Sequence, residues 1–152
     1  MPEKESPLII GSDHAAFALK EAVKAYLTQM GIVVRDVGTH AATSVDYPDF
    51  GAQVARAVSR GEYRRGILIC GTGIGMSIVA NRFPHVRAAL CNDLFAALMS
   101  RRHNDANILV MGGRVLGEGL ALEIVRAWLE TPFEGGRHQD RLDKFDRLGH
   151  KQ

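Results

Sequence analysis

The sequence predicts an α/β fold in which a doubly wound, parallel sheet of five strands is covered by helices on both faces. Short apolar segments alternate with longer segments, mostly of ten or more residues, that carry apolar side chains at helical spacing. Glycine and other turn residues separate them, and this alternation is typical of parallel sheets. The 152 residues, 46% of them hydrophobic, suit a single domain over residues 1–152.

The expected elements follow one another regularly along the chain. The strands are expected at residues 8–10, 33–37, 67–70, 86–91 and 108–111, and the helices at 15–30, 49–60, 76–82, 94–103 and 116–129. Asp49 is the expected cap of the second helix, and Asn92 or Asp93 that of the fourth. After a linker at 131–136, the charged helix at 137–148 has too few apolar residues to fold alone, so we expect it to dock on this domain or on a partner subunit.

Composition and charge exclude several classes of protein. The net charge is only +2 and no run of five like charges occurs, so we expect no nucleic-acid partner. The polar segment Met1 to Pro7 is unlike a signal peptide, and no segment suits a membrane span. The two cysteines, Cys70 and Cys91, form no C-x-x-C motif. We therefore expect a reduced, cytoplasmic protein that does not bind membranes, with Cys91 in a packing role.

Cys70 ends the third apolar strand and directly precedes alternating glycines at 71, 73 and 75. Glycine permits positive φ, so this turn can direct several backbone N–H groups into one anion-binding concavity. A thiol beside such a concavity and a helix N-terminus lies in a positive field that favours the thiolate, which makes Cys70 a base or a nucleophile. The alternative is a buried, inert cysteine.

Two other functions of glycine-rich turns, dinucleotide binding and cysteine phosphatase activity, fit the sequence poorly. A dinucleotide fingerprint needs Gly or Ala three residues after its second glycine, and Met76 stands there, although Asp93 lies where a ribose-binding acid would be sought. A cysteine phosphatase needs an arginine six residues after its thiol, and that residue is again Met76. We expect no cofactor.

Polar residues just beyond other strands are further site residues, because ligands bind outside the carboxyl ends of parallel strands. Asp13 and His14 follow the first strand, although either Ser12 or Asp13 could simply cap a helix. Arg137 and Arg141 lie one turn apart on the last helix and could clamp a phosphate, or could form a solvated face. Arg114 could add a third positive group. We expect no metal site, since the histidines at 14, 103, 138 and 150 lack ligand spacing.

Five separated motifs stand at residues 11–17, 46–48, 66–75, 100–107 and 134–138. They resemble those of the type B ribose-5-phosphate isomerases, a family that also includes allose-6-phosphate and galactose-6-phosphate isomerases, and the likeness runs from Ile9 to about Arg141. The resemblance implies a flavodoxin-like fold, a homodimer or dimer of dimers with sites at subunit interfaces, and metal-free interconversion of ribose 5-phosphate and ribulose 5-phosphate. Some members use a cysteine base and others a glutamate after the glycine turn; Cys70 and Met76 place this chain in the cysteine group.

The resemblance also implies roles for individual residues. Cys70 would be the base, Thr72 would assist proton movement, His103 would protonate the ring oxygen, and Asp13 would hold sugar hydroxyls. The expected substrate-binding residues are Asp13, His14, Tyr47, Gly71, Thr72, Gly73, Ile74, Gly75, Asn104, Arg114, Arg137 and Arg141. Six-carbon sugar phosphates are alternative substrates. A non-catalytic sugar-phosphate sensor and a thiol-dependent phosphatase are the alternatives from other functional classes.

Overall fold

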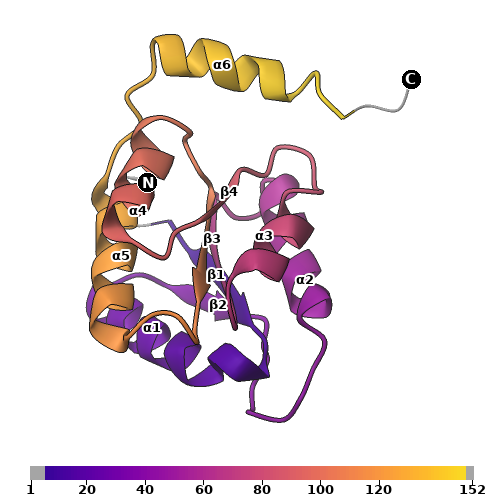
Figure 1. Ribbon diagram of the computed structural model, residues 1–152, viewed down its shortest axis with the longest axis vertical. Coiled ribbons are helices and arrows are strands. Elements are labelled where there is room, and N and C mark those ends of the chain that lie inside the picture. The colour runs from indigo at the N-terminus through magenta and orange to yellow at the C-terminus, as the bar shows by residue number, and fades with distance from the viewer. Residues whose placement is uncertain (1–5, 150–152) are drawn as a thin grey trace.

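The five strands form one parallel sheet, as predicted. The structure, a computed structural model, describes residues 6–149, so the expectations for residues 1–5 and His150 lie outside it. The sheet has the order β2-β1-β3-β5-β4, with these bounds: β1 (Leu8–Ser12), β2 (Val34–Asp36), β3 (Arg65–Cys70), β4 (Ala88–Leu90) and β5 (Ile108–Gly112). Figure 1 shows the sheet between two layers of helices.

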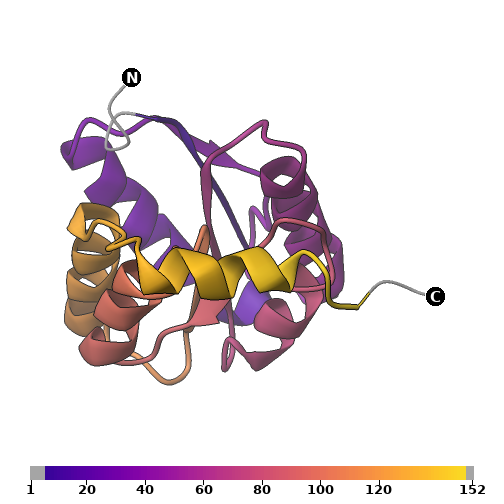
Figure 2. The same cartoon turned by 90° about the horizontal axis from the view of Figure 1, so that it is seen from above.

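Each face of the sheet is covered by its own set of helices. One face is packed by α1 (Phe17–Gln29), α4 (Leu94–Arg102) and α5 (Glu118–Glu130), and the other by α2 (Tyr47–Ser59) and α3 (Ile74–Ala80) (Figure 1). A short 3-10 turn, η2 (His14–Ala16), precedes α1. The last helix, α6 (Arg137–Phe145), joins neither layer and crosses one end of the molecule (Figure 2).

The alternation of side chains along β3 divides the core in two. Ile67 and Ile69 pack with Trp128 on the α1, α4 and α5 side. Leu68 and Cys70 belong to the apolar cluster on the α2 and α3 side. Both faces of β3 are buried, which accounts for the unbroken apolar run that predicted this strand.

Four helices start two residues away from the expected position, and local residues account for two of these differences. The second helix begins at Tyr47, not Asp49, because Pro48 fits the first turn, where no intrahelical N–H bond is needed. Asp49 instead lies within that first turn. The third helix begins at Ile74, two residues early, because Gly73 takes φ +83° and forms its N-cap.

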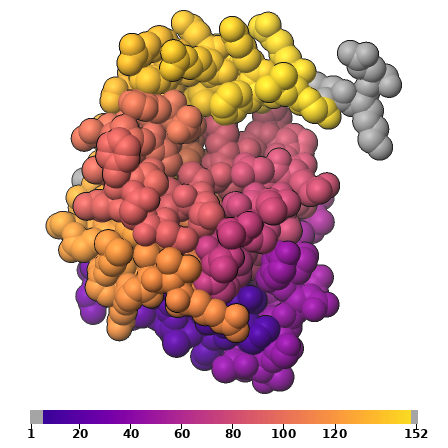
Figure 3. All heavy atoms as spheres, viewed as in Figure 1, coloured from indigo at the N-terminus to yellow at the C-terminus, as the bar shows by residue number. Residues whose placement is uncertain are grey.

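The C-terminal helix α6 contacts the body of this chain through its buried residues His138 and Leu142. In the space-filling view it forms a ridge along one end of the molecule (Figure 3). A cavity of about 880 Å³ lies between α6 and the loop at residues 81–87. Phe145 lines it and is half exposed. Within residues 6–149, no helix is both apolar enough and long enough to cross a membrane.

A buried charge fixes the start of α1 against the end of β2. The ammonium group of Lys20 is fully buried and donates to Asp36 and to the backbone carbonyl of Thr39. Burial alone would raise the pKa of Asp36, but hydrogen bonds from Lys20 and Lys24 hold that pKa below its ordinary value. The carboxylate therefore stabilises the fold above its unfolded pKa, and this contribution is lost as the pH falls through the lowered value.

We predict that Lys20→Met destabilises the protein by about 3 kcal/mol, because it leaves a buried carboxylate without its main partner. Urea unfolding at neutral pH measures the loss, which should shrink in acid as Asp36 becomes protonated. Lys24→Met is the matched control, since this partly exposed ammonium should contribute no more than about 1 kcal/mol. Equal losses for the two variants would contradict the assignment.

Candidate active site

The register of three central strands places polar residues side by side at the carboxyl end of the sheet. Ser12 pairs with Ile69, and Cys70 pairs with Gly112. The N–H of Asp13 donates to the carbonyl of Ile69 over 3.3 Å. The carboxylate of Asp13 accepts the N–H of Ala16, so the capping role considered for it is present. Asp13 therefore both caps the turn η2 and lies close to Cys70.

Cys70 is the last residue of β3, and it borders the apolar cluster beneath α2 and α3 at the carboxyl end of the sheet. The residue is only 4% exposed, and the N–H of Gly113 donates to its carbonyl over 2.8 Å. The second cysteine, Cys91, lies in the other core cluster. Burial raises the pKa of the Cys91 thiol to about 11, which suits the packing role expected for it.

The turn after Cys70 requires two of its glycines for different reasons. A Cβ at Gly73 would lie 2.4 Å from Leu90, and its φ of +83° disfavours other residues. A Cβ at Gly75 would lie 2.5–2.7 Å from the ring and hydroxyl of Tyr47. Because Gly75 has no side chain, the ring of Tyr47, an expected site residue, can pack directly against the turn.

The Thr72 hydroxyl is held in place by the backbone of the same turn. Its oxygen accepts the N–H of Ile74 over 3.2 Å, which leaves the hydroxyl hydrogen able to point elsewhere. The N–H of Ile74 is consequently engaged within the turn, although the glycine pattern had suggested it for anion binding. Thr72 is exposed, so a ligand above the turn can reach its hydroxyl.

Two further expected site residues, Arg114 and His14, follow strands at the carboxyl end of the sheet. The side chain of Arg114 lies 3.4–3.7 Å from the place where a Cβ of Gly71 would be, so it runs along the turn. The Nδ1 atom of His14 accepts the N–H of Val45 over 3.1 Å. A neutral His14 ring therefore carries its hydrogen on Nε2, where it can donate to an anion.

Asn92 holds the glycine turn in place through its side-chain amide, a role that the sequence did not predict. It was a possible helix cap, but Asp93 provides the cap by accepting the N–H of Ala96. The Asn92 amide instead donates to the carbonyl of Thr72 and accepts the N–H of Gly112. It thereby ties the glycine turn to the end of β5. Only the pairing of distant strand ends could have indicated this role.

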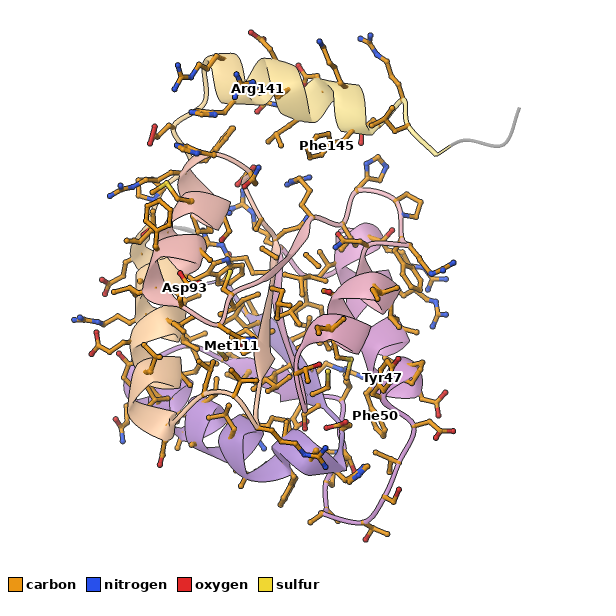
Figure 4. All side chains as sticks on the ribbon, viewed as in Figure 1. Tyr47, Phe50, Asp93, Met111, Arg141 and Phe145 are labelled. Carbon is orange, nitrogen blue, oxygen red and sulfur yellow. The ribbon has the colours of Figure 1, made fainter. Side chains whose placement is uncertain are left out.

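The remaining expected site residues lie at the opposite end of the sheet. His103, Asn104, Arg137 and Arg141 follow α4 or belong to α6, near the amino ends of β3 and β5. Nearby, Gly66 at the start of β3 donates to the carbonyl of Asn107. Figure 4 shows Arg141 and Tyr47 at opposite ends of the molecule. A single chain therefore does not bring its two sets of site residues together.

His103 forms a cluster that the sequence spacing did not indicate. Its ring stacks on that of His138, with centroids 4.2 Å apart and planes 13° apart. The carboxylate of Glu134 lies 4.0 Å from the Nε2 atom of each ring. One nitrogen atom of each ring and one carboxylate oxygen of Glu134 lie within 4.8 Å of one another. The two histidines are therefore close together, although 35 residues apart in sequence.

Met76 occupies the position after the glycine turn where some isomerases of the resembled family carry a glutamate. Its side chain is fully buried, and its sulfur would lie 2.8 Å from a Cβ at Gly51. A thioether cannot exchange a proton, so Met76 offers no alternative to Cys70 as a base.

Comparisons with known proteins identify the family. The family model for ribose/galactose isomerases matches residues 8–145, nearly the whole chain. This chain belongs to the ribose/galactose isomerase family. The isomerase reaction class expected from the motifs is thereby confirmed, as is the fold.

Individual members of this isomerase family agree closely with the chain. Ribose-5-phosphate isomerase B of Escherichia coli is 48% identical over 93% of this chain and 95% of its own. D-erythrulose-4-phosphate isomerase of Pectobacterium atrosepticum is 41% identical over 95% of this chain and 96% of its own. The solved structure of ribose-5-phosphate isomerase B from Clostridium thermocellum has a TM-score of 0.92 at 53% identity and covers 93% of this chain and 96% of its own.

The two cysteines of this isomerase should differ in reactivity. We predict that iodoacetamide at pH 8 modifies Cys70 well before Cys91, because with a pKa of about 11 only about one thousandth of Cys91 is thiolate at that pH. Mass spectrometry of peptides from the folded protein measures the order. Urea should abolish the difference, which serves as the control. Faster modification of folded Cys91 would contradict the packing role.

Proposed function

We propose that this isomerase interconverts ribose 5-phosphate and ribulose 5-phosphate, with the Cys70 thiolate as the base. The observation that carries the proposal is the adjacency of Cys70, Asp13 and Thr72 at the carboxyl end of the sheet. Relatives named for this activity over nearly their whole length support the substrate. The relative named for a four-carbon sugar phosphate makes the choice of substrate a point to be tested.

The first step is the opening of the furanose ring. The bond between C1 and the ring oxygen breaks, the ring oxygen receives a proton, and the C1 hydroxyl loses one, which leaves an aldehyde. His103 supplies the proton to the ring oxygen, and the Asp13 carboxylate can accept the proton from O1. General acid–base assistance of this kind typically contributes 10²–10⁴-fold to a rate.

The second step moves a proton between the first two carbons. The Cys70 thiolate removes the proton from C2, the electron pair of that bond forms the C1–C2 double bond, and the carbonyl electrons move to O1 to give an enediolate. A proton then passes from O2 to O1, the carbonyl forms at C2, and the Cys70 thiol delivers a proton to C1. The turn after Cys70 and the Thr72 hydroxyl bind the charge that develops on the oxygens. Thr72 suits this role because its oxygen already accepts the N–H of Ile74, so its hydrogen can be directed to the enediolate.

The phosphate is held at the far end of the sugar, where it orients C1 and C2 for proton transfer. Arg114 supplies a positive group and His14 an N–H donor from the carboxyl end of the sheet. Arg137 and Arg141 supply two more, from one face of α6.

These contributions require two copies of the chain. The six residues of β3 separate the two sets of site residues by about 17 Å at about 3.3 Å per residue. This exceeds the length of a five-carbon sugar phosphate. We propose that His103, Asn104, Arg137 and Arg141 of one copy complete the site around Cys70 of another.

The surface beside β4 supports this assembly. This strand forms an edge of the sheet, and the helices α3 and α4 on either side of it expose large apolar residues. Ile74 and Ile78 of α3 and Leu94 and Phe95 of α4 are all exposed, Phe95 by 71%. An exposed apolar surface around an edge strand is typical of a subunit interface.

We predict that Cys70→Ala lowers kcat for ribose 5-phosphate by about 10²–10⁴-fold with little loss of substrate binding, since a base acts mainly in the transition state. Coupled measurement of ribulose 5-phosphate gives kcat, and calorimetric titration gives binding. Cys91→Ala is the matched control and should keep kcat near that of the wild type. A Cys70 variant with normal kcat would exclude this base, and faster wild-type turnover of allose 6-phosphate or galactose 6-phosphate would reassign the substrate.

Complementation between inactive variants tests the shared site. We predict that co-expressed Cys70→Ala and His103→Asn chains recover roughly one quarter of wild-type activity, because half of the dimers are mixed and each mixed dimer holds one intact site. Cys70→Ala with Thr72→Ala is the control, since both changes affect the same end of a chain and no intact site can form. No recovery in the first pair would place the whole site within one chain.

A further inference from the structure

His138 is a buried histidine that the proposed mechanism does not use. It is the second residue of α6, and its N–H donates to the carbonyl of Gly135. Its side chain is 7% exposed, whereas that of its stacking partner His103 is 40% exposed. The pair thus consists of one enclosed ring and one accessible ring, which can have different functions.

The contact between the two rings is built into the fold. The buried guanidinium of Arg101 donates to the carbonyls of Thr131 and Ala106, which fastens the linker after α5 to the loop after α4. The N–H of Glu134 then donates to the carbonyl of Arg102, next to His103. These backbone contacts bring Glu134 and His138 to the end of α4, so the stacking does not depend on the side chains alone.

The geometry of the cluster is unsuited to a metal ion as it stands. A metal lies near the plane of each imidazole that binds it, along the nitrogen lone pair. The two rings are nearly parallel and 4.2 Å apart, so one ion cannot lie in both planes. The stacked arrangement instead suits two rings that share one positive charge.

Charge and burial disfavour a proton on the ring of His138. Two protonated rings 4.2 Å apart would repel each other. Burial foremost, then the charges of His103, Arg137 and Arg141, lowers the pKa of His138, and Glu134 opposes this only in part. The buried His138 ring therefore stays neutral to a lower pH than an ordinary histidine. The Glu134 carboxylate lies 4.0 Å from the Nε2 atom of each ring.

We propose that His138 is a positioning residue for the ring-opening acid: stacked against His103, it holds that ring in place and leaves the proton of the pair on it. This inference rests on the proposed function, in which His103 protonates the ring oxygen of the sugar. Glu134 completes the arrangement by attracting the positive charge to this end of α4. His138 itself touches no reacting atom.

The test separates ring opening from proton transfer between carbons. Turnover of ribose 5-phosphate requires both steps. Exchange of the C1 hydrogen of ribulose 5-phosphate in D₂O, followed by NMR, requires only proton transfer, because this ketose is open-chain. We expect His138→Ala to lower kcat for ribose 5-phosphate about tenfold or more, with KM and the exchange rate changed by no more than about twofold.

Two further variants make the outcome specific. His138→Phe keeps a flat ring that can stack and carries no charge, so it should restore most of the ribose 5-phosphate turnover lost in the alanine variant. Gln139→Ala, which alters an exposed neighbour on α6, should leave both rates unchanged. Equal loss of turnover and exchange in His138→Ala, or a raised KM, would make His138 a structural part of the phosphate site and overturn the proposal.

Normal turnover in His138→Ala would also overturn it, as would a failure of His138→Phe to restore turnover. Failure of the proposed function gives a different result, because the wild-type protein would then neither convert ribose 5-phosphate nor exchange the C1 hydrogen of ribulose 5-phosphate.

Discussion

The common direction of the five strands governs where the proposed site residues lie. The carboxyl ends of parallel strands all lie at one end of the sheet, and the helices that connect the strands return the chain to the other end. Residues that follow a strand, such as Asp13 and Cys70, therefore gather at the carboxyl end. Residues that follow a helix, such as His103, are carried to the amino end. A chain of this topology cannot place both groups around one small molecule, and this is the physical reason for proposing a site shared between copies.

The carboxyl end was the more predictable half of the site. The unbroken apolar run before Cys70 indicated a strand buried on both faces, and its last residue had to lie at the rim. The glycines at 73 and 75 indicated a tight turn, and the contacts of Leu90 and Tyr47 account for both. Local patterns were sufficient here because a strand end, a turn and a helix start are all set by neighbouring residues.

The supporting contacts were not predictable in the same way. Asn92 has the sequence context of a helix cap, and only the proximity of the Thr72 carbonyl and the Gly112 N–H gives it another role. The stacking of His138 on His103 depends on how the linker after α5 returns to α4, which Arg101 and Glu134 fix through backbone carbonyls. Contacts between segments some 20 or more residues apart leave no periodic signal in the sequence.

The single tryptophan of the chain lies where these long-range contacts converge. Trp128 is completely buried, and the guanidinium carbons of Arg65 and Arg101 lie 5.4 and 5.8 Å from the centre of its ring. Indole emission is sensitive to nearby charge, and Arg101 also holds the linker that leads to α6. Intrinsic fluorescence therefore reports selectively on the end of the molecule where the amino ends of the strands lie. It follows the packing of α6 without any attached label.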